Sequence, residues 1–305
     1  MTVLKTFNLS KKYNNKYAVN KVNMHIEEGD IYGFVGENGA GKTTILRMIS
    51  GLINPSSGNF TLFDVKNNDK KINEVKKKMG AIVELVSINK GMNALDNLKY
   101  QCFITNTKKT DEELIELIKK VGLDYEQIKD KKVKNFSLGM RQRLGLAVTL
   151  ISSPKFIMLD EPMNGLDPQG FVEIRETIKK LNKEGVTFLI SSHILSELDK
   201  MCNKIGFISH GKLLEEITIE DLHRKSRKRI IVKALDFIGL SEILTKELDL
   251  KEVTTENNNI NIYDNININD LIKFLVTKDI QIESLYFKED NIENYYLNLL
   301  MRGTI

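Results

Sequence analysis

Short apolar segments rich in β-branched and aromatic residues recur along much of the chain, and helical patterns separate several of them. Strands that alternate with helices in this way are typical of a layered α/β fold. The opening segment, Met1–Phe7, has the character of a first strand. The other segments predicted as strands are Ile31–Val35, Phe156–Leu159, Thr187–Ile190 and Lys204–Ser209.

The middle of this region has a helical pattern instead. Between Glu112 and Val121 the apolar residues fall three and four positions apart, which places them on one face of a helix. We therefore expect a helical insert at about 85–135 within the α/β domain.

A second set of strands and helices follows the basic run Arg224–Arg229. A solvated linker explains such a run more often than a phospholipid or nucleic-acid patch does. The pattern predicts an α/β domain at 1–223 and a small α+β domain at 224–305. Within the latter, the expected strands are Ile230–Val232, Val253–Thr254, Ile260–Tyr263 and Ile282–Phe287, with helices near Leu240–Leu248 and Leu271–Thr277.

The Asn-rich stretch Asn257–Asn269 contains isoleucines at positions 260, 262, 266 and 268. Alternating apolar and polar residues fit a half-buried hairpin better than a disordered segment. We therefore expect Ile260, Ile262, Ile266 and Ile268 to belong to a hairpin.

Composition excludes several classes of protein. Among 305 residues, 28% are charged and the net charge is +4, so no nucleic acid partner is expected. Cys102 and Cys202 lie far apart without neighbouring metal-binding motifs, which argues against a disulfide framework and a zinc site. No run approaches the roughly 20 apolar residues that cross a bilayer. If the protein serves a membrane, another chain spans it.

A glycine-rich segment, Gly36-Glu-Asn-Gly-Ala-Gly-Lys42-Thr43-Thr44, follows the predicted strand Ile31–Val35 and opens a helical run, Ile45–Ile49. It matches the pattern Gly-x-x-x-x-Gly-Lys-[Ser/Thr], in which backbone N–H groups surround phosphate oxygens. In this chemistry Lys42 reaches the β- and γ-phosphates of ATP and Thr43 ligates Mg²⁺. The predicted nucleotide-binding residues are Gly36, Asn38, Gly39, Ala40, Gly41, Lys42, Thr43 and Thr44.

Two carboxylates, Asp160 and Glu161, end the apolar strand that begins at Phe156. Buried charges are costly without a partner, so a cation is expected beside them. We predict that Asp160 holds Mg²⁺ and that Glu161 polarises the attacking water as a general base. Together with the glycine-rich segment, the pair predicts ATP hydrolysis.

Three further segments make the pattern more specific: Phe136-Ser137-Leu-Gly139-Met140-Arg-Gln-Arg, Asn164-Gly-Leu-Asp167 and Ser191-Ser192-His193. In order and spacing, the set resembles ABC ATPases over roughly Met1–Glu216. The resemblance implies a phosphate-loop α/β domain with a mixed-sheet core and a helical subdomain.

The resemblance also implies a head-to-tail homodimer in which each ATP lies between one subunit's phosphate loop and the other's signature segment. Ser137, Gly139 and Met140 belong to that signature segment, and Ser137 is expected to start a helix that faces the γ-phosphate.

By the same resemblance, Asp167 links the two sites of the dimer. His193 contacts the γ-phosphate and helps to hold the attacking water. Tyr13 stacks on the adenine ring.

The sequence departs from the family pattern at Glu84, in the strand-like segment Ala81–Val86, where most members have Gln. A carboxylate there adds negative charge beside the metal, so we expect Glu84 to act on Mg²⁺ and on catalysis. Drift to a side chain of similar shape is the alternative explanation. The signature differs as well, because Leu138 replaces its first Gly and Met140 its Gln. Glu84 and this signature resemble ATPases of bacterial exporters that protect against bacitracin or lantibiotic peptides.

We therefore expect an ATPase motor on the cytoplasmic face of the membrane, bound there to an integral-membrane permease through a groove in the helical insert. Its predicted cofactors are ATP and Mg²⁺. A motor for another exported substrate is an alternative. So is a soluble ABC ATPase that acts on ribosomes or DNA, although such forms typically have two fused units or a long coiled coil. A module that binds ATP without turnover is disfavoured by Glu161 and His193.

Overall fold

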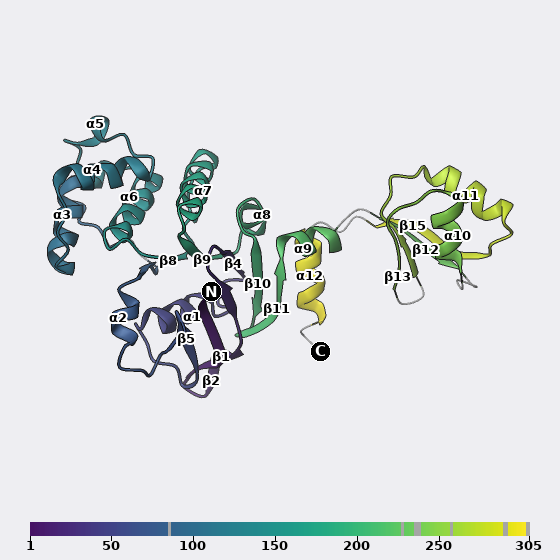
Figure 1. The fold of residues 1–305 in the computed structure, drawn as a ribbon, viewed down its shortest axis with the longest axis horizontal. Coiled ribbons are helices and arrows are strands. Elements are labelled where there is room, and N and C mark those ends of the chain that lie inside the picture. The colour runs from purple at the N-terminus through teal and green to yellow at the C-terminus, as the bar shows by residue number, and fades with distance from the viewer. Residues whose placement is uncertain (85–86, 227–228, 235–238, 257–258, 289–291, 303–305) are drawn as a thin grey trace. The chain divides into compact units, whose positions relative to one another are not determined.

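The computed structural model describes residues 1–84, 87–226, 229–234, 239–256, 259–288 and 292–302 (Figure 1). The chain divides into two compact units, Met1–Ile219 with Arg302, and Glu220–Met301, whereas the predicted boundary was 223–224. Leu85 and Val86, at the expected start of the helical insert, lie outside the described residues, as do 227–228 of the basic run and 257–258 of the Asn-rich stretch.

Among the described residues, a six-stranded sheet with the order β11-β10-β4-β9-β8-β7 runs through the first unit (Figure 1). Its strands are parallel except for β11, which pairs antiparallel with β10 at one edge. Every residue of β4 and β8 is buried, as expected for strands covered on both faces. The strands are β4 (Ile31–Val35), β7 (Met79–Ile82), β8 (Phe156–Asp160), β9 (Thr187–Ser192), β10 (Lys204–Ser209) and β11 (Lys212–Thr218).

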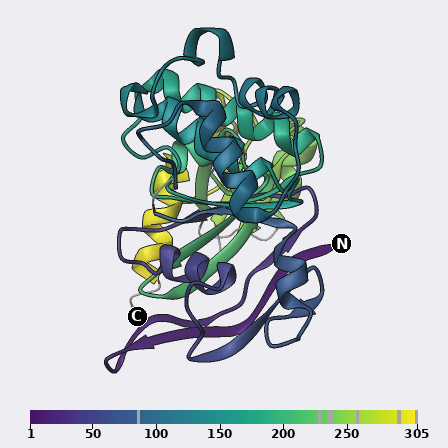
Figure 2. The same ribbon diagram turned by 90° about the vertical axis from the view of Figure 1, so that its left-hand side faces the viewer.

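An antiparallel sheet forms the second layer of this unit, with β1 between β2 and β5. The purple strands β1 and β2 run side by side in Figure 2. Asn14 and Asn15 join them with φ values of 42° and 68°, as in a tight two-residue hairpin turn, so Tyr13 lies next to the hairpin tip. The strands are β1 (Thr2–Tyr13), β2 (Lys16–Val22), β3 (His25–Glu27), β5 (Ser57–Leu62) and β6 (Val65–Lys66).

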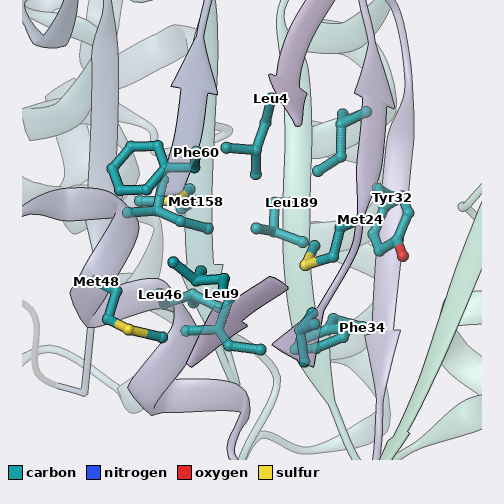
Figure 3. Close-up of a cluster of buried hydrophobic side chains, with 14 of the residues drawn as sticks. Leu4, Leu9, Met24, Tyr32, Phe34, Leu46, Met48, Phe60, Met158 and Leu189 are labelled. Carbon is teal, nitrogen blue, oxygen red and sulfur yellow. The ribbon is translucent and has the colours of Figure 1, made fainter. Parts of the chain in front are cut away.

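Helix α1 (Lys42–Ser50) contributes apolar side chains to a core that it shares with strands of both sheets (Figure 3). Leu46 and Met48 belong to the same buried cluster as Phe60 of β5 and Met158 of β8. Because close-packed interiors resist displacement, this core fixes the first turn of α1 relative to the end of β8.

The helical insert is formed by separate short helices. The predicted helix at Glu112–Val121 is confirmed as α4, which Thr110 and Glu113 start with a capping box. Helix α2 (Ile72–Lys76) precedes the insert and packs against β5 and β6. The insert contains α3 (Ala94–Thr105), α4 (Asp111–Lys120), α5 (Tyr125–Ile128) and the 3₁₀ helix η1 (Val133–Asn135), and α6 (Leu138–Leu150) follows it. Two further helices, α7 (Pro168–Lys183) and α8 (Leu195–Asp199), follow β8 and β9.

The second unit contains a four-stranded antiparallel sheet with the order β13-β14-β12-β15. The succession β-α-β-β-α-β with this strand order is the ferredoxin-like arrangement, which agrees with the predicted α+β class. Its core includes Ile230, Val232, Leu244 and Leu271. The elements are α9 (Ile219–Lys225), β12 (Arg229–Ala234), α10 (Leu240–Glu247), β13 (Val253–Glu256), β14 (Asn259–Ile262), α11 (Ile268–Thr277), β15 (Ile282–Lys288) and α12 (Ile292–Arg302).

Two local predictions are wrong. The hairpin of the Asn-rich region pairs β13 with β14, so Ile266 and Ile268 do not belong to it. Ile268 opens α11 because the side chain of Asn267 accepts a hydrogen bond from the N–H of Asn269 and caps the helix. The expected strand around Ala81 ends at Ile82, and Glu84 has a left-handed φ of 65°.

The basic run is also not a plain linker. Arg224 and Lys225 end α9, where the negative end of the helix dipole stabilises cations. Arg229 begins β12. Within the part of the chain that the structure describes, no helix has both the length and the apolar character needed to cross a membrane.

Candidate functional site

The candidate site lies at the carboxyl ends of three neighbouring parallel strands, β4, β9 and β8. The glycine-rich loop follows β4, Asp160 and Glu161 lie at the end of β8, and His193 follows β9. Ligands of open α/β sheets bind at this edge. The topology therefore joins segments that lie far apart in the sequence.

Glycines allow the loop to take its path. Gly41 has a φ of 110°, and a Cβ there would lie 2.5 Å from the carbonyl oxygen of Ala18. A Cβ at Gly36 would lie 2.5 Å from the carbonyl oxygen of Ile208. The tip of the loop, which includes Asn38 and Gly39, is exposed, whereas Ala40 and Lys42 are buried.

Lys42 places its ammonium group inside this loop although only 5% of the residue is exposed. Its Nζ donates to the carbonyl oxygens of Gly36, at 2.5 Å, and Glu37, at 3.2 Å. The same Nζ forms an ion pair with Glu161 Oε1 at 3.2 Å, without the geometry of a hydrogen bond. A buried cation therefore lies between the loop and the carboxylate after β8.

Asp160 is held by two hydroxyl groups. Thr43 Oγ1 donates to its Oδ2 at 2.8 Å, and Ser191 Oγ donates to its Oδ1 at 2.5 Å. Hydroxyl and carboxylate oxygens are suitable ligands for Mg²⁺. The sequence analysis gave Ser191 no role of its own. Its position beside Asp160 at the end of the adjacent parallel strand is the signal that could have identified it.

Glu161 is oriented by contacts on both its backbone and its carboxylate. Its φ is 49°, and its N–H donates to the carbonyl and hydroxyl oxygens of Ser191 at 3.1 and 3.0 Å. Oε2 lies 2.9 Å from Nδ1 of His193, while Oε1 faces Lys42. The carboxylate predicted as the general base is thus fixed between the lysine and the histidine.

The predicted signature residues form a second group, at the starts of α6 and α7. Ser137 caps α6 by accepting from the N–H of Met140 at 3.2 Å, and Asp167 caps α7 by accepting from the N–H of Gly170 at 2.9 Å. A Cβ at Gly139 would lie 3.7 Å from Leu166 Cδ2, so the two segments are neighbours. Two helix N-termini, each with partial positive charge, therefore lie close together.

Tyr13 and Glu84 are more exposed than the residues around Asp160. Tyr13 is 45% exposed, and Lys11 Nζ lies 5.2 Å from the centre of its ring. The carboxylate of Glu84 forms an ion pair with Arg47 of α1. It does not take part in the hydrogen bond between Thr43 and Asp160. The hydrogen bond from Arg47 to Glu84 raises the pKa of the Arg47 guanidinium.

The sequence analysis missed Arg47. It lies one helical turn after Thr43 on α1, and that spacing is the signal that could have placed it beside the predicted metal site.

A family model described as ABC transporter matches residues 19–164. The chain is 38% identical over 307 residues to the bacitracin transport ATP-binding protein BcrA of Bacillus licheniformis, a match that covers 100% of this chain and 99% of the relative. The chain belongs to the ATP-binding proteins of ABC transporters. Members of the ABC ATPase family bind ATP and couple its hydrolysis to transport, which makes this chain an ATPase.

Two other comparisons agree with this family. The lantibiotic transport ATP-binding protein SrtF of Streptococcus pyogenes is 42% identical over 214 residues, which cover 70% of this chain and 90% of the relative. A dimeric ATP-binding cassette solved in a post-hydrolysis state with ADP and Pi has a TM-score of 0.63 and 26% identity, and the match covers 71% of this chain and 99% of that chain. The predicted family and ABC ATPase fold are therefore confirmed.

Glu84 offers a first test of how charge acts in this ABC ATPase. Glu84→Gln removes the counter-charge of Arg47, so we expect the Mg²⁺ concentration for half-maximal hydrolysis to change. Exposed ion pairs contribute about 1 kcal/mol or less, which limits the change to about fivefold. Titration of ATPase activity with Mg²⁺ measures it.

Asp111→Asn is the matched control, because Asp111 pairs with Lys99 in the helical insert at similar exposure. Its metal titration should equal that of the parent protein. Identical titrations and identical transport for Glu84→Gln would show that its charge has no effect.

Proposed function

We propose that this ABC ATPase powers an exporter that protects its cell from antimicrobial peptides of the bacitracin or lantibiotic type. The observation that carries the proposal is the extent of similarity to the bacitracin relative, which covers 100% of this chain and therefore includes the second unit. The match to the lantibiotic relative covers only 70% of this chain. Bacitracin is therefore the first substrate to test.

The residues of the site fit Mg²⁺-bound ATP. A buried cation, Lys42, lies inside the glycine loop, and Thr43 and Asp160 provide adjacent oxygen ligands. Mg²⁺ on these ligands would act as a Lewis acid on the phosphate oxygens. Lys42 neutralises phosphate charge and releases Glu161 to accept a proton from the attacking water.

The remaining site residues have supporting roles in this proposal. His193, hydrogen-bonded to Glu161, orients the water and the γ-phosphate. Glu84 acts on the metal through its charge, which Arg47 partly balances. Tyr13, exposed beside the hairpin tip, stacks on adenine.

A second copy of the chain completes the site. The group of Ser137, Gly139, Met140 and Asp167 directs helix N-termini toward the partner's phosphates, for which their partial positive charge is suited. The dimeric solved cassette supports this arrangement. In the proposed cycle, ATP closes the dimer and hydrolysis opens it.

We assign the permease contact to the exposed apolar face of α3, which carries Tyr100, Phe103 and Ile104, with Phe103 83% exposed. Another face of the same helix, with Gln101 and Thr105, lines a cavity of about 920 Å³ together with residues of β7 and α6. An exposed apolar group of this kind marks an interaction site. Its proposed occupant is an amphipathic cytoplasmic segment of the permease, which would hold the ATPase at the inner face of the cell membrane.

The test measures the killing concentrations of bacitracin and nisin for host cells that carry the permease and one variant of this chain. Parent protein should protect, and Glu161→Gln should not. Phe103→Asp should also fail to protect although the purified variant still hydrolyses ATP, because a charge on the exposed apolar face of α3 blocks docking. Leu52→Asp, at a position 66% exposed in the turn after α1, is the control and should protect.

The arms separate the possible explanations. Equal killing in all strains would reject peptide protection and leave a motor for another exported substrate. Recovery of the ATPase from solubilised cells with ribosomes, and without a membrane protein, would reject the transport function itself.

A further inference from the structure

Helix α7 connects the two groups of site residues. It begins at the cap residue Asp167 and carries two charged residues, Glu173 and Arg175, that are two positions apart. At about 100° per residue, their side chains leave opposite sides of the helix. Each of them forms an ion pair with a different neighbouring helix.

Arg175 joins α7 to α8. Its Nη1 donates to Glu197 Oε2 at 2.8 Å, and Lys200 Nζ donates to Glu197 Oε1 at 2.6 Å. The side chains of Arg175 and Glu197 are only 15% and 10% exposed. Glu197 lies on α8, which begins two residues after His193, so this pair is attached to the element that directly follows the histidine.

Glu173 joins the opposite side of α7 to α6. Arg143 Nη2 lies 2.8 Å from Glu173 Oε2, and Arg143 Nη1 donates to the carbonyl oxygen of Gly122 at 2.6 Å. Helix α6 begins at Ser137, the predicted contact to the partner's ATP. The helices that start at Ser137 and at Asp167 are thus tied together, and α7 is tied in turn to α8.

We propose that Arg175 and Glu197 are positioning residues that hold His193 at a fixed position relative to Asp167. The pair is suited to this role because charge-assisted hydrogen bonds fix geometry, whereas apolar contacts allow sliding. Burial makes loss of one partner costly, so the two helices move together. The inference rests on the proposed roles of His193 and Glu161 in hydrolysis.

A kinetic cycle tests the inference. Arg175→Gln with Glu197→Gln removes both charges without leaving one of them buried alone. We expect this pair variant to lower kcat by roughly 10- to 100-fold, as small misplacements of catalytic groups do, with the KM for ATP changed by less than about threefold. His193→Ala is then measured alone and combined with the pair variant, each at a temperature well below its Tm.

If the pair acts through His193, the kcat of the combined variant is at most about twofold lower than that of the slower parent variant, either His193→Ala or the pair variant. The reason is that the effects of residues that act as a unit are not additive. Multiplicative losses, or an unchanged kcat in the pair variant, would overturn the inference. If the pair variant does not fold, Glu197→Gln alone is carried through the same cycle.

Two controls separate this inference from the function on which it rests. Lys120→Gln with Glu184→Gln neutralises an ion pair at the other end of α7 and should keep the parent kcat. If His193→Ala alone keeps full kcat, the proposed hydrolytic role fails and the inference fails with it. If His193→Ala is slow but the cycle is multiplicative, only the positioning role is lost.

Discussion

Glu161→Gln is expected to reduce ATP turnover by roughly 10²- to 10⁴-fold, the contribution of a well-placed general base. Glu161 has the geometry for this role, because its carboxylate is fixed between Lys42 and His193 at the end of β8. An amide has the same shape but cannot take up the proton of the attacking water. Binding of ATP should remain, since Lys42 and Thr43 are unchanged.

The variant should keep its fold for a local reason. The oxygen of the introduced amide can face Lys42 while its NH₂ group donates to His193 Nδ1, so neither contact becomes repulsive. Without hydrolysis, the ATP-bound form should accumulate as a closed dimer.

Phosphate release and size-exclusion chromatography with ATP measure these two effects. Glu126→Gln, on an exposed side chain of α5, is the control and should hydrolyse ATP at the parent rate. Full turnover by Glu161→Gln would remove Glu161 as the base.

The chemistry of the site could be predicted from sequence where it depends on contiguous residues. The segment from Gly36 to Thr44 contains its own turn and helix start directly after a strand, so local pattern was sufficient for its fold. The expected start of a helix at Ser137 was found for the same reason, because the side chain that caps α6 belongs to the segment itself.

Contacts between distant segments could not be predicted in this way. Lys42 contacts Glu161 because β4 and β8 lie in the same sheet with only β9 between them. No local sequence pattern specifies this strand order. The same reason explains why Ser191 was missed, whereas Arg47 could have been found from its helical spacing after Thr43. The pairing of Arg175 with Glu197 likewise depends on how α7 and α8 pack.

The second unit shows how an element can be assigned correctly while its boundaries are not. Alternating isoleucines predicted strand through Ile268, but β14 already ends at Ile262, and the hydrogen bond by which Asn267 caps α11 makes Ile268 helical. Helix α9 was not predicted because its basic residues had been explained as a linker, and α12 was not predicted either. Periodicity located the core, and capping determined the ends.

Lys42→Ala should weaken ATP binding at least roughly 25-fold, because loss of one partner of a buried charge pair costs about 2–5 kcal/mol. The parent lysine is already positioned for this interaction, with its stem buried and its Nζ held by Gly36 and Glu37. In the structure its anionic partner is Glu161. Phosphate groups would take the place of that carboxylate when ATP binds.

The loss of Lys42 therefore has two consequences that can be separated by measurement. Affinity for ATP falls because no cation meets the phosphates, and Glu161 loses its neighbouring positive charge in the free protein. Calorimetric titration with ATP and Mg²⁺ measures the first effect, with Lys99→Ala as a control on an exposed lysine. Unchanged affinity in Lys42→Ala would mean that Lys42 serves only to neutralise Glu161. Phosphate binding by the loop would then depend on the backbone N–H groups of the loop alone.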